Sequence, residues 1–356
     1  MKLSKIVFNV FQNFSTAAQN IMIKPAHIPV MVNEVLHYLK PETDQIILDM
    51  TFGSGGHSKK ILEHAPNVKI LALDRDPHAY EYALKLATQF PGQIVPLLGK
   101  FSDLPELLAE QSFGKCSLDG ILFDFGCSSM QFDLPQRGFS ISKNGPLDMR
   151  MDGNRIPDAP TAADVLSKAT EIDIYRIIKY YGEEKQARKI ARSIVEARYL
   201  FKALTSTEEL ADLVETVVDG VSKFNPVVDK KIHVATKTFQ ALRIFVNNEL
   251  NEINYGMLLA HHYLKIGGRV VTITFHSLED MIVKRHLSGN LIANSANPIP
   301  LKFSSYNLFM DSNIINQVLE LNWNMLHKNV IVPSFDEIDS NSRSRSSKLR
   351  AAIKIK

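Results

Sequence analysis

The spacing of apolar and polar residues changes several times along the chain, and each change predicts a different element. Short apolar runs rich in β-branched residues stand at 46–50, 69–74, 94–98, 120–125 and 269–275. Between them, apolar residues recur every three or four positions at 58–65, 77–89 and 104–110. Strands that alternate with helices predict βαβ units and a parallel sheet covered on both faces. We therefore expect a doubly wound, mostly parallel α/β fold of the Rossmann-like class.

This alternation stops after position 125. Residues 138–231 show no strand pattern, but loops rich in Gly, Pro and Asp and four expected helices at 161–166, 172–180, 184–201 and 206–218. They predict an inserted helical subdomain for substrate recognition, with the main domain formed by 25–137 and 232–356. A long helix at 236–264 should lead back into the strand at 269–275. Residues 330–332 and 349–353 are candidates for two late antiparallel strands.

Composition places the chain among ordinary globular proteins. It has 356 residues, 45% of them hydrophobic and 22% charged, with a net charge of +3 that by itself does not indicate a nucleic-acid partner. Its two cysteines, Cys116 and Cys127, form neither a disulfide framework nor a four-ligand zinc site, which favours a reducing compartment. No apolar run approaches the roughly 20 residues that cross a bilayer, so no membrane partner is expected.

The first 24 residues resemble a targeting leader. Leu3, Ile6, Val10 and Phe14 fall on one helical face, lysines are interspersed, and no acidic residue precedes Glu34. A basic, acid-free amphipathic leader is typical of a mitochondrial presequence, which predicts the mitochondrial matrix. A secretory signal is the alternative, although polar residues at 9, 12 and 13 interrupt its apolar core.

A glycine-rich loop follows the first expected strand and precedes a helix. The strand ends near Asp49, the loop contains Gly53, Gly55, Gly56 and His57, and the second strand ends at Asp74. Glycines there let a ligand approach the backbone, and an acid about 20 positions later can bind ribose hydroxyls. Dinucleotides and S-adenosylmethionine (SAM) both fit this pattern. The glycines here have the spacing G-x-G-G and not the G-x-G-x-x-G of dinucleotide-binding loops. Together with Asp49, which can face the ammonium group of SAM, this spacing favours SAM.

Asp124 ends the fourth expected strand. Ligands of open α/β sheets bind at the carboxyl ends of the strands, near the point where the strand order reverses. Asp124 is therefore expected beside the reacting group, where enzymes that methylate exocyclic amines place a polar residue. The Pro-Pro-aromatic run that usually follows in such enzymes is absent here.

Several segments together resemble one family. They are 51–58 (TFGSGGHS), 74–77 (DRDP), 124–129 (DFGCSS), 137–140 (RGFS), 145–152 (GPLDMRMD), 181–184 (YGEE), 238–244 (TFQALRI), 275–280 (FHSLED) and 343–350 (RSRSSKLR). They are similar to the RsmH/MraW family of small-subunit rRNA (cytosine-N4)-methyltransferases, and the leader points to its mitochondrial branch. The resemblance implies a class I methyltransferase sheet and SAM contacts at Gly55, Gly56, His57, Asp74, Phe101, Asp124 and Gln131.

The catalytic candidates are acceptors that can bind the cytosine amino group. Asp124 is the first, with binding of SAM alone as its alternative role, and Asp148, His276 and Glu279 follow. His276 could instead pack at the strand end, Glu279 could instead cap a helix, and no metal is required. Phe139 could stack on a base flipped into the pocket. Two basic groups could bind phosphates: the helix face with Lys185, Arg188, Lys189 and Arg192, and the tail with Arg343 and Arg345.

Three functions remain open from the sequence. The leading prediction is an rRNA cytosine-N4 methyltransferase that acts on small-subunit rRNA, on naked RNA or within an assembling ribosomal subunit. A non-catalytic ribosome-assembly factor that binds SAM or RNA is the second, and a nicotinamide dehydrogenase is the third. The sequence also leaves open whether the chain forms a homodimer.

Overall fold

The computed structural model describes residues 29–200, 203–218, 233–288 and 323–356. The expected leader at 1–24 and the end of the expected insert at 219–231 lie outside these residues. Within them, no helix combines the length and apolarity that a membrane crossing requires.

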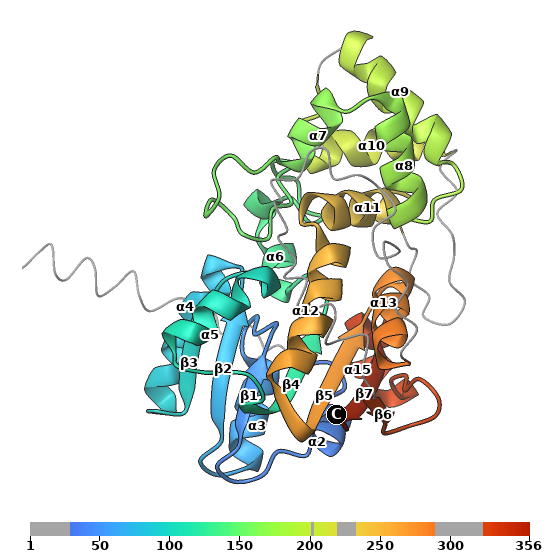
Figure 1. Ribbon diagram of the computed structural model, residues 1–356. Helices are drawn as coiled ribbons and strands as arrows, with labels where there is room; N and C mark the ends of the chain where they lie inside the picture. The colour runs from blue at the N-terminus through green and yellow to red at the C-terminus, as the bar shows by residue number, and fades with distance from the viewer. Residues whose placement is uncertain (1–28, 201–202, 219–232, 289–322) are drawn as a thin grey trace, which may run out of the picture.

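A seven-stranded sheet forms the centre of the molecule (Figure 1). Its strands are β1 (Ile46–Asp49), β2 (Lys69–Asp74), β3 (Ile94–Leu98), β4 (Leu118–Asp124), β5 (Leu264–Thr274), β6 (Trp323–Met325) and β7 (Lys348–Lys354). They lie in the order β3-β2-β1-β4-β5-β7-β6. The first five are parallel, whereas β7 runs antiparallel to both β5 and β6. The predicted doubly wound, mostly parallel fold is confirmed, and its order reverses at the β1–β4 boundary.

Alternate residues of the strands face two helical layers, as the pleat of a strand requires. Ile47, Ile70 and Leu122 pack against α2 (Val32–Leu39), α3 (Gly56–His64) and α4 (Pro77–Gln89). Their neighbours Leu48, Leu71 and Ile121 face α5 (Leu104–Glu110), α12 (Glu249–Tyr263) and α13 (Ser277–Leu287). Both faces are thus buried, which explains the continuous apolar runs.

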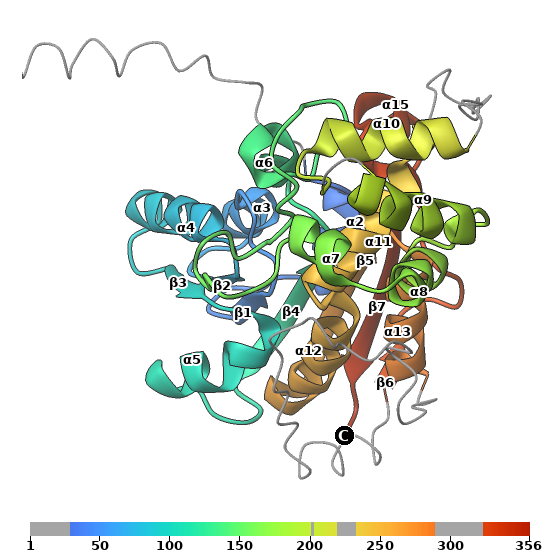
Figure 2. The same ribbon diagram turned by 90° about the horizontal axis from the view of Figure 1, so that it is seen from above.

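The insert helices stack beyond the carboxyl ends of the strands (Figures 1 and 2). After the short α6 (Ser129–Asp133) they are α7 (Ala162–Lys168), α8 (Glu171–Tyr181), α9 (Ala187–Leu200) and α10 (Thr207–Val217), close to the predicted ranges. Thr161, Thr170 and Ser206 cap three of them through side-chain oxygens, as N-cap residues do. α11 (Thr236–Val246) packs against α7 and α8, so the insert shares one continuous core with the sheet domain. The domain bounds stay a prediction.

Two predicted elements are wrong. The long helix at 236–264 is broken: α11 ends at Val246, Asn248 adopts a left-handed φ of +51°, and α12 begins at Glu249. Asn tolerates this conformation better than most residues, so the chain can change direction here. Residues 330–332 form only a single bridge, between Ile331 and Leu349, and β6 instead pairs with β7. The strand predicted at 349–353 is confirmed as β7.

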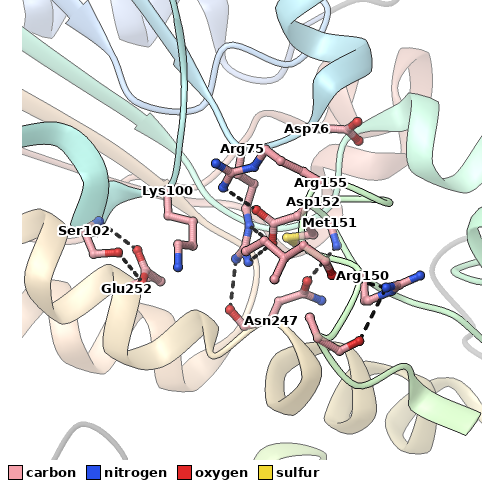
Figure 3. A network of polar contacts seen from close by, with 12 residues as sticks. Arg75, Asp76, Lys100, Ser102, Arg150, Met151, Asp152, Arg155, Asn247 and Glu252 are labelled. Atoms are coloured by element: carbon pink, nitrogen blue, oxygen red, sulfur yellow. Dashed lines mark hydrogen bonds and ion pairs between the residues drawn. The ribbon is translucent and has the colours of Figure 1, made fainter. Parts of the chain in front are cut away.

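Asn247, beside this break, ties the helices to the loop that enters the insert. It is 1% exposed, and its carboxamide accepts from Met151 N at 2.7 Å and donates to Met149 O at 2.7 Å. Arg75, directly after β2, donates to the Asn247 carbonyl at 2.9 Å and pairs with Asp152 of the same loop (Figure 3). The end of β2, the insert loop and the helix break are therefore held together.

Asn247→Ala should lower the free energy of unfolding by about 2–4 kcal/mol, because it leaves buried backbone groups of the loop without partners. Urea denaturation followed by circular dichroism measures the change. Asn251→Ala is the matched control: its side chain makes one local bond, to Asn248, and its loss should cost under about 1 kcal/mol. Equal losses for the two variants would contradict the assignment.

Candidate active site

A cavity of about 600 Å³ opens at the carboxyl ends of β1, β2, β4 and β5. This volume lies within the ~300–1,000 Å³ typical of small-molecule sites. The cavity lies at the β1–β4 reversal, where open α/β sheets bind ligands. Its walls come from the loops after these strands, from the α11–α12 junction and from the tail near Arg343.

The glycine loop after β1 forms one wall. Gly53 and Gly55 have φ angles of +55° and +79°, which favour glycine. A Cβ on Gly55 would lie 2.5 Å from Phe52 Cζ, so a side chain cannot be added without displacing that ring. Gly56 begins α3 and, with His57, lines the cavity. The loop thus offers backbone and a helix N-terminus to a ligand.

The two acids predicted around this loop differ in their surroundings. Asp49 is buried, and its carboxylate accepts from Ser58 Oγ at 2.6 Å and Thr51 N at 3.1 Å, so it supports the loop and does not line the cavity. Asp74 does line it, and accepts from Gly53 N at 2.7 Å and Asp76 N at 2.9 Å. Burial raises the pKa of Asp74 to about 7.

Asp124, at the end of β4, carries a buried polar atom that lacks a partner. Its Oδ1 has no hydrogen bond within the described part of the chain, and the residue lines the cavity. Burial raises the pKa of Asp124 to about 7. An unpartnered acceptor is costly unless a ligand satisfies it, and so indicates that a donor binds here.

His57 lies against the same carboxylate. Its Nε2 is 2.8 Å from Val30 O, and its Nδ1 is 3.7 Å from Asp124 Oδ2. Burial lowers the pKa of His57, so the ring is neutral. Because a carbonyl only accepts, the proton belongs on Nε2, and Nδ1 faces Asp124 with a lone pair. His57 therefore leaves the aspartate without a compensating charge.

Phe101 and Gln131 complete the predicted cofactor residues, and both line the cavity. The Phe101 ring packs edge to face on Phe123 with centroids 5.6 Å apart, and leaves an apolar surface suited to a flat heterocycle. The Gln131 amide is fixed: Oε1 accepts from Ser128 N at 3.1 Å, and Nε2 donates to Asp76 at 2.9 Å.

Besides Asp49 and Gly55, three further predicted site residues do not line the cavity. Both carboxylate oxygens of Asp148 bind Arg150, each at 2.8 Å. His276 caps α13 by accepting from Leu278 N at 3.1 Å, and burial lowers its pKa to about 4. Phe139 is 4% exposed within the core. Phe132, which is 37% exposed and lines the cavity, is the accessible ring that the sequence analysis missed.

Arg243 and Glu249 line the cavity and were also missed. The guanidinium donates to the Glu249 carboxylate at 2.8 and 2.9 Å and to Glu279 at 3.4 Å. Arg243 lies in the family motif at 238–244. Its pairing with Glu249 and its place on the cavity wall became visible only in the structure, where α11 and α12 meet.

The predicted RNA-binding residues fall into two groups. Lys185, Arg188, Lys189 and Arg192 are exposed in the turn before α9 and on that helix, whose other side is buried. Of the tail pair, Arg343 lines the cavity and contacts the Ser129 hydroxyl, while Arg345 is half-buried. The structure thus places one cationic surface on the insert and one arginine at the cavity.

Comparison with known proteins gives one consistent family. A model of the MraW methylase family matches residues 24–355. The Drosophila melanogaster protein named probable methyltransferase-like protein 15 homolog is 53% identical over 330 residues, 92% of each chain. The human 12S rRNA N(4)-cytidine methyltransferase METTL15 is 47% identical over 337 residues, 92% of this chain and 83% of that protein.

A third relative is longer. The putative receptor-type tyrosine-protein phosphatase mosPTP-1 of Culex quinquefasciatus is 57% identical over 329 residues. The match covers 92% of this chain, which spans 22% of that protein's length. The name of that protein therefore refers to a much longer chain, of which the matched part is less than a quarter.

The raised pKa of Asp124 has a consequence for stability. The unfolded carboxyl ionises near 3.8, whereas the folded one retains its proton to about 7. Rising pH therefore favours unfolding between these values, and the penalty is complete above the folded pKa. Asp124→Asn removes the ionisation and should raise the free energy of unfolding of the ligand-free protein by about 1–3 kcal/mol at pH 8, with no gain at pH 4.

Denaturant unfolding at the two pH values measures this difference. Asp148→Asn is the control, because it disrupts a formed ion pair with Arg150 and should destabilise the protein at pH 8. An Asp124→Asn variant no more stable than the wild type at pH 8 would show that the carboxylate is satisfied in the fold.

Proposed function

The chain belongs to the MraW methylase family, as its motifs predict, and we propose that it methylates the exocyclic N4 amine of a cytidine in small-subunit rRNA. The observation that carries the proposal is the Oδ1 atom of Asp124. This buried acceptor belongs to a residue that lines the cavity, and it has no hydrogen-bond partner among the described residues. An amino group is the donor that this atom lacks. The human relative named for 12S rRNA and N4-cytidine supports the same substrate.

The cofactor is SAM, which supplies an electrophilic methyl group on a cationic sulfur. We assign its binding to the residues of the glycine-loop side of the cavity. Asp74 would accept from the ribose hydroxyls, since a carboxylate oxygen with one backbone bond retains a lone pair. Phe101 would pack on adenine, and Gly53, Gly56 and His57 would border the amino-acid end. A nicotinamide dinucleotide fits the glycine spacing G-x-G-G less well than SAM does. Because the chain belongs to a methylase family, the dehydrogenase alternative is excluded.

Asp124 would act on the amine. The lone pair of the cytosine amino nitrogen is delocalised into the ring, and an acceptor that binds its N–H concentrates electron density on nitrogen. As the N–C bond forms, nitrogen becomes positive and must lose a proton. A carboxylate whose pKa lies near 7 is suited to accept this proton, because its pKa is close to the pH at which the enzyme works.

The insert would hold the RNA. The exposed basic side chains of α9 and of the preceding turn can bind phosphates, and Arg343 can bind one at the cavity mouth. A base must leave its stack to reach Asp124, and Phe132 offers a ring on which it can stack. We further propose that the substrate is an assembling small subunit in the mitochondrial matrix. This rests on the basic leader and the 12S rRNA relative. A homodimer stays a prediction, which sedimentation would test.

Loss of the protein should remove N4-methylcytidine from small-subunit rRNA, and the wild type but not Asp124→Ala should restore it. Removing an acceptor that acts on the reacting group should lower kcat about 10²- to 10³-fold. Mass spectrometry of rRNA nucleosides measures the product. Restored ribosome assembly by Asp124→Ala without methylation would instead support the non-catalytic assembly factor.

RNA affinity should fall steeply with salt, and replacing Lys185, Arg188 and Lys189 by alanine should reduce the slope of log K against log [salt] by about two to three units. Filter binding from low to high salt measures the slope. The control replaces Lys59 and Lys60 on α3, which already pair with Glu63. An unchanged slope in the insert variant would refute phosphate contact there.

A further inference from the structure

The short helix α6 forms a continuous part of the cavity wall. All five of its residues line the cavity, and Ser129, Phe132 and Asp133 stand three and four positions apart, on one face of the helix. The Phe132 ring is 37% exposed and meets Phe139 edge to face, with 6.4 Å between the ring centroids. An edge-to-face contact covers at most one face of a ring, so Phe132 keeps a flat surface for a base.

A cation contacts each end of this helix. At the first residue, Arg343 donates through Nη1 to the Ser129 hydroxyl. At the last residue, Lys143 donates through Nζ to the Asp133 carbonyl at 2.9 Å and to its carboxylate at 3.1 Å. Both cations line the cavity. Because four residues of a helix rise by about 6 Å, the two charged groups bracket Phe132 over a length comparable to one nucleotide of a strand.

Each cation retains donors for an anion. The Lys143 ammonium has three donors, of which Asp133 occupies two, and its side chain is 38% exposed. The Arg343 guanidinium is exposed and uses one N–H on the Ser129 hydroxyl, a neutral acceptor that leaves its charge uncompensated. No carboxylate among the described residues forms an ion pair with Arg343. Asp133 offsets part of the Lys143 charge and also fixes its position.

Two cations on either side of an exposed ring match the chemistry of one nucleotide within an RNA strand. Such a nucleotide presents a base between a phosphate on its 5′ side and a phosphate on its 3′ side. Sites for single strands combine aromatic stacking of bases with cations along the backbone. The hydroxyls of Ser140 and Ser142, 3.2 Å apart, also line the cavity beside Lys143 and offer further donors. SAM, by contrast, carries one carboxylate and cannot occupy both cations.

We propose that Lys143 and Arg343 bind the two phosphates that flank the target cytidine, while its base stacks on Phe132. This inference rests on the proposed function, and it adds Lys143 to the RNA-binding residues and defines a site for a single nucleotide. A base reaches an enzyme pocket only after it leaves its stack. Holding the backbone on both sides of the nucleotide restricts where its base can lie, so the two cations are positioning residues for the methyl acceptor.

The test uses cytidine 3′,5′-bisphosphate, the smallest ligand that carries the base and both phosphates, beside the 3′- and 5′-monophosphates of cytidine. Calorimetry at low salt measures Kd for the full-length protein saturated with S-adenosylhomocysteine. For the wild type, the bisphosphate should bind about 5- to 10-fold more tightly than either monophosphate, because each phosphate meets its own cation. Lys143→Met should abolish the gain from one phosphate, and Arg343→Met the gain from the other.

The controls separate charge at the cavity from charge in general. Lys265→Met removes a lysine that is 44% exposed, pairs with Asp119 at 2.7 Å and does not line the cavity, so both gains should remain. Lys143→Arg and Arg343→Lys keep the charges and should keep most of each gain. Titration of every variant with SAM reports whether it is folded and whether the cofactor site is intact.

The outcomes separate this inference from the proposed function. A wild type that gains nothing from the second phosphate, or equal gains in the wild type and both methionine variants, overturns the nucleotide site even if rRNA is methylated. Weaker SAM binding by Arg343→Met with both phosphate gains retained would assign Arg343 to the cofactor carboxylate and also overturn it. Separate losses in the two variants support the site; if small-subunit rRNA then stays unmethylated, the proposed reaction fails and the nucleotide site stands.

Discussion

The ion pair between Arg75 and Asp152 joins parts of the chain that are otherwise distant. Arg75 directly follows Asp74, which lines the cavity, and Asp152 belongs to the loop that enters the insert (Figure 3). Their side chains are 15% and 6% exposed, and breaking such a buried pair typically costs about 3–5 kcal/mol. Asn247 holds the same loop against the helix break. The β2 side of the cavity and the insert loop are therefore coupled, and neither can shift without breaking buried polar contacts.

A second constraint is the concentration of acids at the strand ends. Burial raises the pKa of Asp49, Asp74 and Asp124, and none of the three has an arginine or lysine in contact among the groups that shift its pKa. Backbone and hydroxyl donors satisfy Asp49 and Asp74 in part. A cationic ligand would lower all three pKa values, whereas a pyrophosphate would oppose their ionisation. The electrostatics thus agree with a sulfonium cofactor independently of the spacing of the glycines.

Much of the fold could be predicted because its elements are encoded locally. The five parallel strands are apolar runs, and the insert helices begin at Thr161, Thr170 and Ser206, whose capping side chains are visible in the sequence. The position of the cavity followed from the parallel sheet, which brings the ends of β1, β2 and β4 to one edge. The sequence did not reveal which polar residues are satisfied by a near neighbour. Asp148 binds Arg150 and His276 caps its own helix, and neither partner is evident from the motif.

The break that sequence analysis missed is also what brings Arg243 and Glu249 together at the cavity wall. In one uninterrupted helix, positions 243 and 249 would lie about 240° apart around the axis and about 9 Å along it, on different faces. At the left-handed Asn248 the chain changes direction, so that Glu249 in the first turn of α12 meets Arg243 in the last turn of α11 (Figure 1). Each helix terminus then carries the charge that its dipole favours. The periodicity of apolar residues could not reveal this, because it is continuous across a break that a single left-handed residue creates.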